Sequence, residues 1–110
     1  MTPYERTVQH ATHTASMLKL IAHPHRLMIL CLLAESEHNV TELVKAVGIN
    51  QTAVSNHLAK MRADGIVDYT RYHRVLQYRL ISPEVRAVLD TINGQCLHRE
   101  DADGTSEQAS

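Results

Sequence analysis

The side chains best suited to chemistry in this 110-residue chain are two cysteines, Cys31 and Cys96, and eight histidines. A thiolate can attack sulfane sulfur or a peroxide, and a second thiol can resolve the product. A thiol oxidoreductase would need a closely spaced pair such as Cys-x-x-Cys, whereas these cysteines lie far apart in the sequence. The sequence also has no Ser-His-Asp pattern and no glycine loop for phosphate. We therefore expect neither enzymatic activity nor a cofactor.

A second set of functional side chains lies in the stretch GINQTAVSNHLAKMRADGIV, residues 48–67. The predicted helix in this stretch is apolar on one side, through Ile49, Val54 and Leu58, and polar on the other. Gln and Asn can each form two hydrogen bonds with an adenine edge, and Ser and Thr are adaptable partners. The pattern predicts a helix that reads base edges in the major groove of DNA. The side chains expected to face the DNA are Gln51, Thr52, Ser55, Asn56 and His57.

Positive charge is concentrated on and after this polar helix, although the whole chain has a net charge of −1. Residues 55–80 contain five Lys and Arg against two Asp, whereas residues 81–110 contain two Arg and six acidic residues. Basic side chains in such a local patch are suited to contacts with the phosphate backbone. The residues expected to make these contacts are Lys60 and Arg62 near the helix end, and Arg71, His73 and Arg74 at a hairpin tip.

Two apolar helices are predicted before this region. Apolar residues recur at three- and four-residue steps from about residue 6 to 21, which indicates an amphipathic helix. A second helix, apolar on nearly all sides and therefore central, is expected from Pro24 to about residue 35. His23, which precedes it, is expected to cap or pack against this helix.

Capping residues mark the next two helices. Thr41 is expected to cap a short helix over residues 42–47 that ends at Gly48. Asn50 is expected to cap the polar helix, which then covers about residues 51–63. The pair Asp64-Gly65 should end that helix.

After Gly65 the sequence pattern changes from helical to alternating. Two β-rich runs on either side of TRYHR predict an antiparallel hairpin, and Ser82 and Pro83 then begin a last apolar-faced helix. The expected fold is mainly α, with the order helix-helix-helix-helix-strand-strand-helix, and the hairpin forms the wing of a winged helix-turn-helix. Residues 1–98 should form this DNA-binding and dimerisation domain, and residues 99–110 an acidic, disordered tail.

Length and composition indicate one small helical domain. The chain contains no Phe and no Trp, so its core must consist of aliphatic residues and Met. A domain of this size often gains stability by pairing through an apolar helix face. No apolar run approaches the roughly 18 residues of a membrane span, and the polar N-terminus lacks the apolar segment of a secretion signal. We expect a cytoplasmic protein with no membrane partner, whose cysteines are reduced by default.

Three stretches resemble the ArsR/SmtB family of bacterial repressors: LKLIAHPHRLMILCLL, VTELVKAVGINQTAVSNHLAKMRADGIV and RVLQYRL. The resemblance covers roughly residues 15–92 and includes TAVSNHL at the position of the family's recognition helix. It implies a homodimer, paired through its first and last helices, that binds a palindromic operator in double-stranded DNA. It also implies a small inducer that releases the DNA.

The two metal sites common in that family are absent from this sequence. The helix before the recognition helix has no thiol, and Arg86 stands where an imidazole would be needed after Glu84. Cys31 and Cys96 instead resemble the thiol-based branch of the family, the BigR, SqrR and HlyU type. That resemblance implies release from DNA when reactive sulfur species or oxidants link the two cysteines. Cys96 lies about one position earlier than in that branch, which is roughly 100° of rotation on a helix.

Two alternatives stay open at this point. A zinc-responsive or other metal-responsive repressor of the same family would use a site between the terminal helices, because thiolate and imidazole groups are tetrahedral zinc ligands. Its ligands would be His10, His13, Cys96 and His98. A constitutive DNA-binding protein would keep binding after both cysteines were changed to Ser. Our main hypothesis is a thiol-switched homodimeric repressor with no resident metal.

Overall fold

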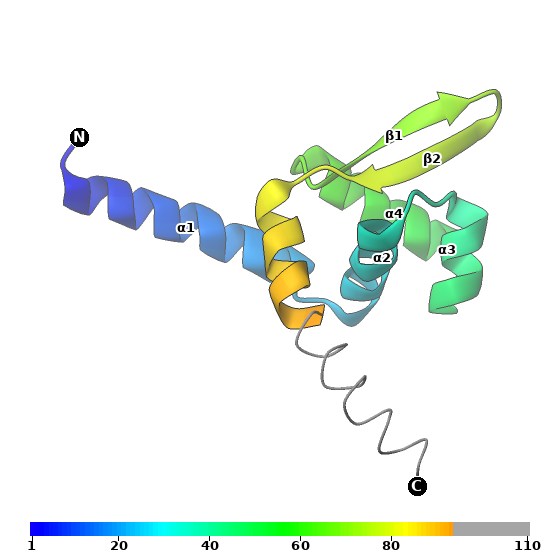
Figure 1. Cartoon of the computed structure of the whole chain (residues 1–110), viewed down its shortest axis with the longest axis horizontal. Coiled ribbons are helices and arrows are strands. Elements are labelled where there is room, and N and C mark those ends of the chain that lie inside the picture. Colours follow the sequence, from blue (N-terminus) through cyan, green and yellow to red (C-terminus); the bar gives the residue numbers. More distant parts are fainter. Residues whose placement is uncertain (94–110) are drawn as a thin grey trace, which may run out of the picture.

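The computed structural model describes residues 1–93 of the chain. Within these residues five helices and one antiparallel hairpin follow one another in the predicted order, so the predicted winged helix-turn-helix fold is confirmed (Figure 1). The last helix covers residues 83–93 of the described part. The other elements are α1 (Pro3–Ile21), α2 (Pro24–Glu35), α3 (Val40–Val47), α4 (Gln51–Ala63), β1 (Val67–Tyr72) and β2 (Val75–Leu80).

Short-range capping fixes the start of α2 and both ends of α4, as predicted. The side chain of His23 caps α2, because its Nδ1 accepts a hydrogen bond from the backbone N–H of His25 at 3.2 Å. Asn50 caps α4 through Oδ1, which accepts the backbone N–H of Ala53 at 2.8 Å. Beyond the end of α4, Gly65 has a φ of 73°, a left-handed conformation that glycine adopts easily.

The start of α3 differs from the prediction, in which Thr41 was the cap. Asn39 is the N-cap: the backbone N–H of Glu42 donates to its Oδ1 at 2.8 Å. The carboxylate of Glu42 accepts the backbone N–H of Asn39 in return, at 2.9 Å. This reciprocal pair satisfies two N–H groups that the helix leaves without partners, which a cap by Thr41 alone would not do. α3 therefore begins at Val40.

α1 also starts earlier than the expected residue 6. The side chain of Thr2 accepts the backbone N–H of Glu5 at 3.1 Å, and Pro3 occupies the first helical position. Proline suits that position because its missing N–H would have no partner in the helix. The local signals at Thr2 and Pro3 therefore extend the helix to Pro3.

A single aliphatic core holds α2, α3, α4 and the last helix together and is closed by the base of the hairpin. The packing depends on aliphatic side chains and Met, as the absence of Phe and Trp requires. The core residues that are almost inaccessible to solvent are Ile29, Leu30, Leu33, Leu43, Val54, Leu58, Met61, Val67, Val85 and Leu89.

The helix α1 projects away from this core (Figure 1). Only Ile21, at its end, is buried, whereas Val8 and Leu18 are 48% and 42% exposed. The apolar face predicted for this helix therefore has little to pack against within one chain. Among residues 1–93 no single helix is long and apolar enough to cross a membrane. Only α1 and α2 taken together pass that test, and the pair is bent by 96°.

The hairpin extends from the opposite side of the core (Figure 1). Its strands pair from Val67 opposite Leu80, at the buried base, to Tyr72 opposite Val75, near the tip. This register leaves His73 and Arg74 as the two residues of the turn.

Candidate functional site

The helix α4 separates a buried apolar face from an exposed polar one. Val54, Leu58 and Met61 are fully buried against the core. The turn before α4 is tight because Gly48 ends α3 in the left-handed region, with a φ of 81°. The predicted base-reading side chains that the structure leaves exposed are Gln51, Thr52, Ser55 and Asn56, and Lys60 is exposed with them.

His57 is the one predicted base-reading residue that lies apart from this exposed face. Its side chain is half-buried, and the Nε–H of Arg26 donates a hydrogen bond to its Nδ1 at 3.1 Å. Burial lowers the pKa of His57, and the neighbouring His23 and Arg26 lower it further. The neutral form of the ring is thus favoured beside the start of α2, and a contact with DNA stays a prediction.

Arg62, the second basic residue near the end of α4, is already engaged inside the chain. Its Nε–H donates to Oδ1 of Asp68 on β1 at 3.0 Å, and its guanidinium lies over the ring of Tyr69. This hydrogen bond, together with that from the backbone N–H of Tyr69, holds the pKa of Asp68 below its usual range. A phosphate contact by Arg62 would have to compete with this pairing, which the sequence pattern did not reveal.

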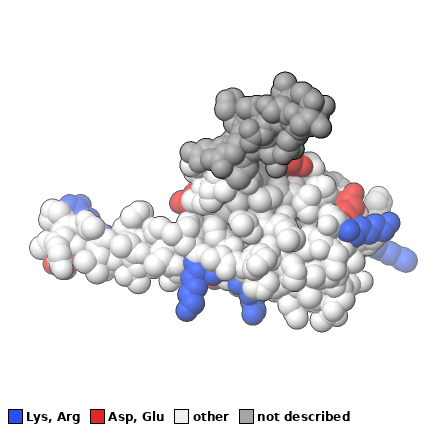
Figure 2. Space-filling model, turned by 90° about the horizontal axis from the view of Figure 1, so that it is seen from below, with Lys and Arg blue, Asp and Glu red and all other residues white. Residues whose placement is uncertain are grey.

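The hairpin tip presents its basic residues without such an engagement. Arg71, His73 and Arg74 are all exposed. His73 adopts a φ of 58°, a left-handed conformation in which His is several-fold enriched over other non-glycine residues. On the visible part of the face turned away from the hairpin, Lys and Arg side chains are few and separated (Figure 2). The structure therefore presents basic side chains at the tip, as the sequence predicted.

Cys31 lies on α2, half-buried, at the edge of an apolar groove between α2 and α3. Asn93, on the last helix, contacts Sγ of Cys31 in both directions: the Nδ2–H donates to Sγ at 3.2 Å, and the thiol donates to Oδ1 at 3.6 Å. Sequence reasoning did not single out Asn93. A signal was present, because Asn93 lies four positions after the buried Leu89 and so shares its helix face. Cys96, the predicted partner of Cys31, lies outside the described residues.

The alternative metal ligands are only partly described. His10 and His13 are exposed on α1, and His13 lines a small hollow together with Glu84 at the start of the last helix. The first and last helices therefore approach each other within one chain. Cys96 and His98 lie outside the described residues.

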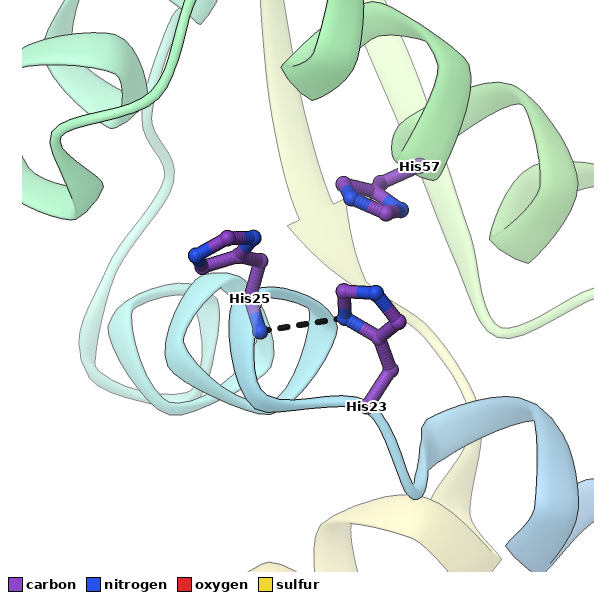
Figure 3. A group of neighbouring side chains, drawn as sticks. All are labelled: His23, His25 and His57. Carbon is purple, nitrogen blue, oxygen red and sulfur yellow. Dashed lines mark hydrogen bonds between the residues drawn. The ribbon is translucent and has the colours of Figure 1, made fainter.

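A histidine cluster that sequence reasoning missed joins the start of α2 to α4. One ring nitrogen from each of His23, His25 and His57 lies within 4.8 Å of the others (Figure 3). The ring centroids of His23 and His57 are 4.7 Å apart, those of His23 and His25 5.5 Å, and those of His25 and His57 6.2 Å. No local spacing could reveal the cluster, because only the tertiary fold brings α4 to the start of α2.

The Gly48 turn, the exposed polar face of α4 and the basic hairpin define a winged helix-turn-helix DNA-binding protein. Residues 23–69 match the family model described as bacterial regulatory protein, arsR family. The chain belongs to the ArsR family of transcriptional regulators, and the relatives it matches are regulators rather than enzymes.

Two curated relatives illustrate this similarity. The chain is 34% identical to the HTH-type transcriptional regulator YgaV of Escherichia coli, over 84% of this chain and 94% of YgaV. It is 38% identical to the transcriptional activator HlyU of Vibrio cholerae, over 70% of this chain and 71% of HlyU.

Two solved structures share the fold. The transcriptional repressor BigR from Xylella fastidiosa superimposes with a TM-score of 0.73 and 36% identity, over 81% of this chain and 91% of that chain. The homodimeric winged helix-turn-helix domain Mb0332 from Mycobacterium bovis superimposes with a TM-score of 0.72 and 26% identity, over 94% of this chain and 93% of that chain.

Proposed function

We propose that this chain is a homodimeric repressor that binds a palindromic operator when Cys31 and Cys96 are reduced. Reactive sulfur species or oxidants that link the two cysteines release it from the DNA. The observation that carries this proposal is the hydrogen bond from Asn93 to Sγ of Cys31, which brings the last helix against α2 at the thiol.

The position of Asn93 supports pairing of the two cysteines. Cys96 follows Asn93 by three positions, and three residues of extended chain span at most about 11 Å. Three residues of chain therefore place Cys96 within reach of a bond between the two sulfur atoms or of a polysulfide bridge.

The chemistry needs only the two thiols and an external oxidant. With hydrogen peroxide, the Cys31 thiolate attacks one oxygen and becomes a sulfenic acid, while hydroxide leaves. The Cys96 thiol then attacks that sulfur, the disulfide forms, and water leaves. With glutathione persulfide, the Cys31 thiolate takes the outer sulfur and glutathione thiolate leaves. Attack by Cys96 on the Cys31 sulfur then releases hydrosulfide and leaves the same disulfide.

The exposed face of α4 and the hairpin tip supply the DNA-binding part of the proposal. Gln51, Thr52, Ser55 and Asn56 are exposed where a recognition helix contacts base edges. Lys60 and the tip residues are exposed and suited to phosphate contacts. The homodimer is proposed from the unpartnered apolar face of α1 and from the homodimeric neighbour Mb0332.

A second candidate function uses a metal in place of the thiol switch. His10 and His13 are exposed one turn apart on α1, and α1 approaches the start of the last helix. With Cys96 and His98 they would offer thiolate and imidazole ligands for zinc. In this case zinc, rather than an oxidant, would change the affinity for the operator.

The deciding experiment combines intact-mass spectrometry with operator binding on the same metal-free samples. Each sample is treated with glutathione persulfide, hydrogen peroxide or glutathione disulfide, and Cys31→Ser and Cys96→Ser serve as controls. We expect a link between Cys31 and Cys96 in the wild type, with loss of operator binding, and neither effect in the controls. Unchanged operator binding in linked protein would contradict the switch, and a response to zinc alone would favour the second candidate.

A further inference from the structure

We infer that His23, His25 and His57 form a binding site for a divalent transition metal of the zinc type between α2 and α4. This site goes beyond the proposed function and shares no residue with the set His10, His13, Cys96 and His98. It uses the cluster in Figure 3, whose three rings lie side by side where α2 begins against α4.

The spacing of the three rings matches what one metal ion requires. Zinc binds imidazole nitrogen at about 2.0–2.1 Å, so three rings around a tetrahedral ion have their centroids about 5 Å apart. The observed separations are 4.7, 5.5 and 6.2 Å. A small rotation of His25 toward the other two rings would therefore complete the arrangement.

The surroundings also suit a metal. All three histidines are half-buried, so they are partly withdrawn from competing water while an ion can still enter. A metal binds only the unprotonated nitrogen of imidazole, and each of the three rings places one ring nitrogen near those of the other two. Three protein ligands leave the fourth tetrahedral position to water.

Two existing hydrogen bonds bear on which ring nitrogens a metal would use. Nδ1 of His57 accepts from Arg26, and Nδ1 of His23 accepts the backbone N–H of His25. Neutral rings that accept at Nδ1 carry their proton on Nε2, so a metal at either nitrogen displaces a donor or a proton. A metal at Nδ1 of His57 would compete with Arg26 and so couple metal binding to the contact between α2 and α4, whereas a metal at Nε2 would displace only a proton.

The test uses Co²⁺ alone as the probe, added to reduced, metal-free full-length protein. Tetrahedral Co²⁺ with nitrogen ligands absorbs in the visible range, whereas a thiolate ligand adds a charge-transfer band in the near ultraviolet. The informative variant is His25→Asn. The side chain of His25 takes part in neither of the two hydrogen bonds above, so its replacement leaves both in place. The matched control is the double variant His10→Asn and His13→Asn on α1. Thermal unfolding followed by circular dichroism checks that both variants are folded.

We expect one Co²⁺ per chain with a visible spectrum and no thiolate band in the wild type and in the control. His25→Asn should weaken binding at least about tenfold, as expected for the loss of a ligand. Equal Co²⁺ affinity of His25→Asn and wild type would overturn the inference. A thiolate band that disappears in the α1 control would also overturn it and would assign the metal to the terminal helices.

Discussion

At the scale of single residues, the Cys31–Asn93 contact leads to the first prediction. The carboxamide of Asn93 donates from Nδ2 to Sγ of Cys31 and accepts from the thiol at Oδ1, so it orients the sulfur that reacts. Asn93→Leu keeps the size of the side chain but removes the donor. We expect alkylation of Cys31 by iodoacetamide to slow several-fold in this variant, measured by mass spectrometry of the modified peptide at fixed pH.

The control for this prediction is Thr91→Ala on the same helix. Thr91 is exposed, and its hydroxyl donates only to the backbone carbonyl of Ala87. Its removal should leave the alkylation rate of Cys31 unchanged. An equal rate in Asn93→Leu and wild type would mean that Asn93 packs beside the thiol without orienting it for reaction.

The exposed residues of α4 should separate into two kinds when they are replaced. Ser55→Ala and Asn56→Ala should lose discrimination between operator and altered operator by about 1–3 kcal/mol, because base-edge contacts carry sequence information. Lys60→Ala should weaken binding to all sequences alike and reduce the slope of log affinity against log salt by about 0.9. Fluorescence anisotropy over a series of salt concentrations measures both effects. A sequence-dependent loss in Lys60→Ala would assign that residue to the bases instead.

The residue-scale features that the sequence could not reveal all depend on tertiary contacts. His57 meets His23, Arg62 meets Asp68, and Asn93 meets Cys31 only after the chain folds. In each pair the two residues lie in, or directly next to, different helices or strands. Polar helix faces, by contrast, follow from local spacing, and the exposure of Ser55 and Asn56 was predictable for that reason.

At the scale of elements, the two candidate caps of α3 can be compared directly. Asn39→Ala removes one half of the reciprocal hydrogen-bonded pair with Glu42, so we expect a loss of about 1 kcal/mol in the free energy of unfolding. Thr41→Ala should change this free energy by less than about 0.5 kcal/mol, because Thr41 is exposed and is not the cap. Urea denaturation of both variants gives the comparison. A larger loss in Thr41→Ala than in Asn39→Ala would mean that Thr41 is the cap of α3, as the sequence predicted.

Element boundaries were predictable wherever one local signal dominated. Asn50 and Gly48 each had no nearby competitor, and the structure confirms them as the cap of α4 and the end of α3. At the start of α3 two caps lay close together, and the pairing of Asn39 with Glu42 prevailed over Thr41. At the start of α1 the signal from Thr2 and Pro3 was more informative than the apolar period, which begins later.

At the scale of the whole molecule, α1 should determine the oligomeric state. Val8 and Leu18 are large apolar side chains that one chain leaves 48% and 42% exposed. Leu18→Glu places a charge on this face, and burying it in an interface would be costly. We expect the variant to shift from dimer to monomer in sedimentation equilibrium and to bind the palindromic operator at least tenfold more weakly, since half-sites would be bound singly.

Gln9→Glu is the matched control, because it adds the same charge to α1 at an exposed polar position. It should leave the sedimentation behaviour close to that of the wild type. A dimer that survives Leu18→Glu would mean that another surface pairs the chains, and the apolar face of α1 would then need a different partner.

The projection of α1 from the body also has a consequence for how such regulators diverge. Only the end of α1 is buried in its own chain, so substitutions along the rest of it leave the core and α4 intact. In the proposed dimer through α1, a few changes on this helix after a gene duplication would suffice to stop two copies from forming mixed dimers. Each copy would still read the ancestral operator at first. Separate regulatory circuits could thus arise before any change in the DNA sequence that is recognised.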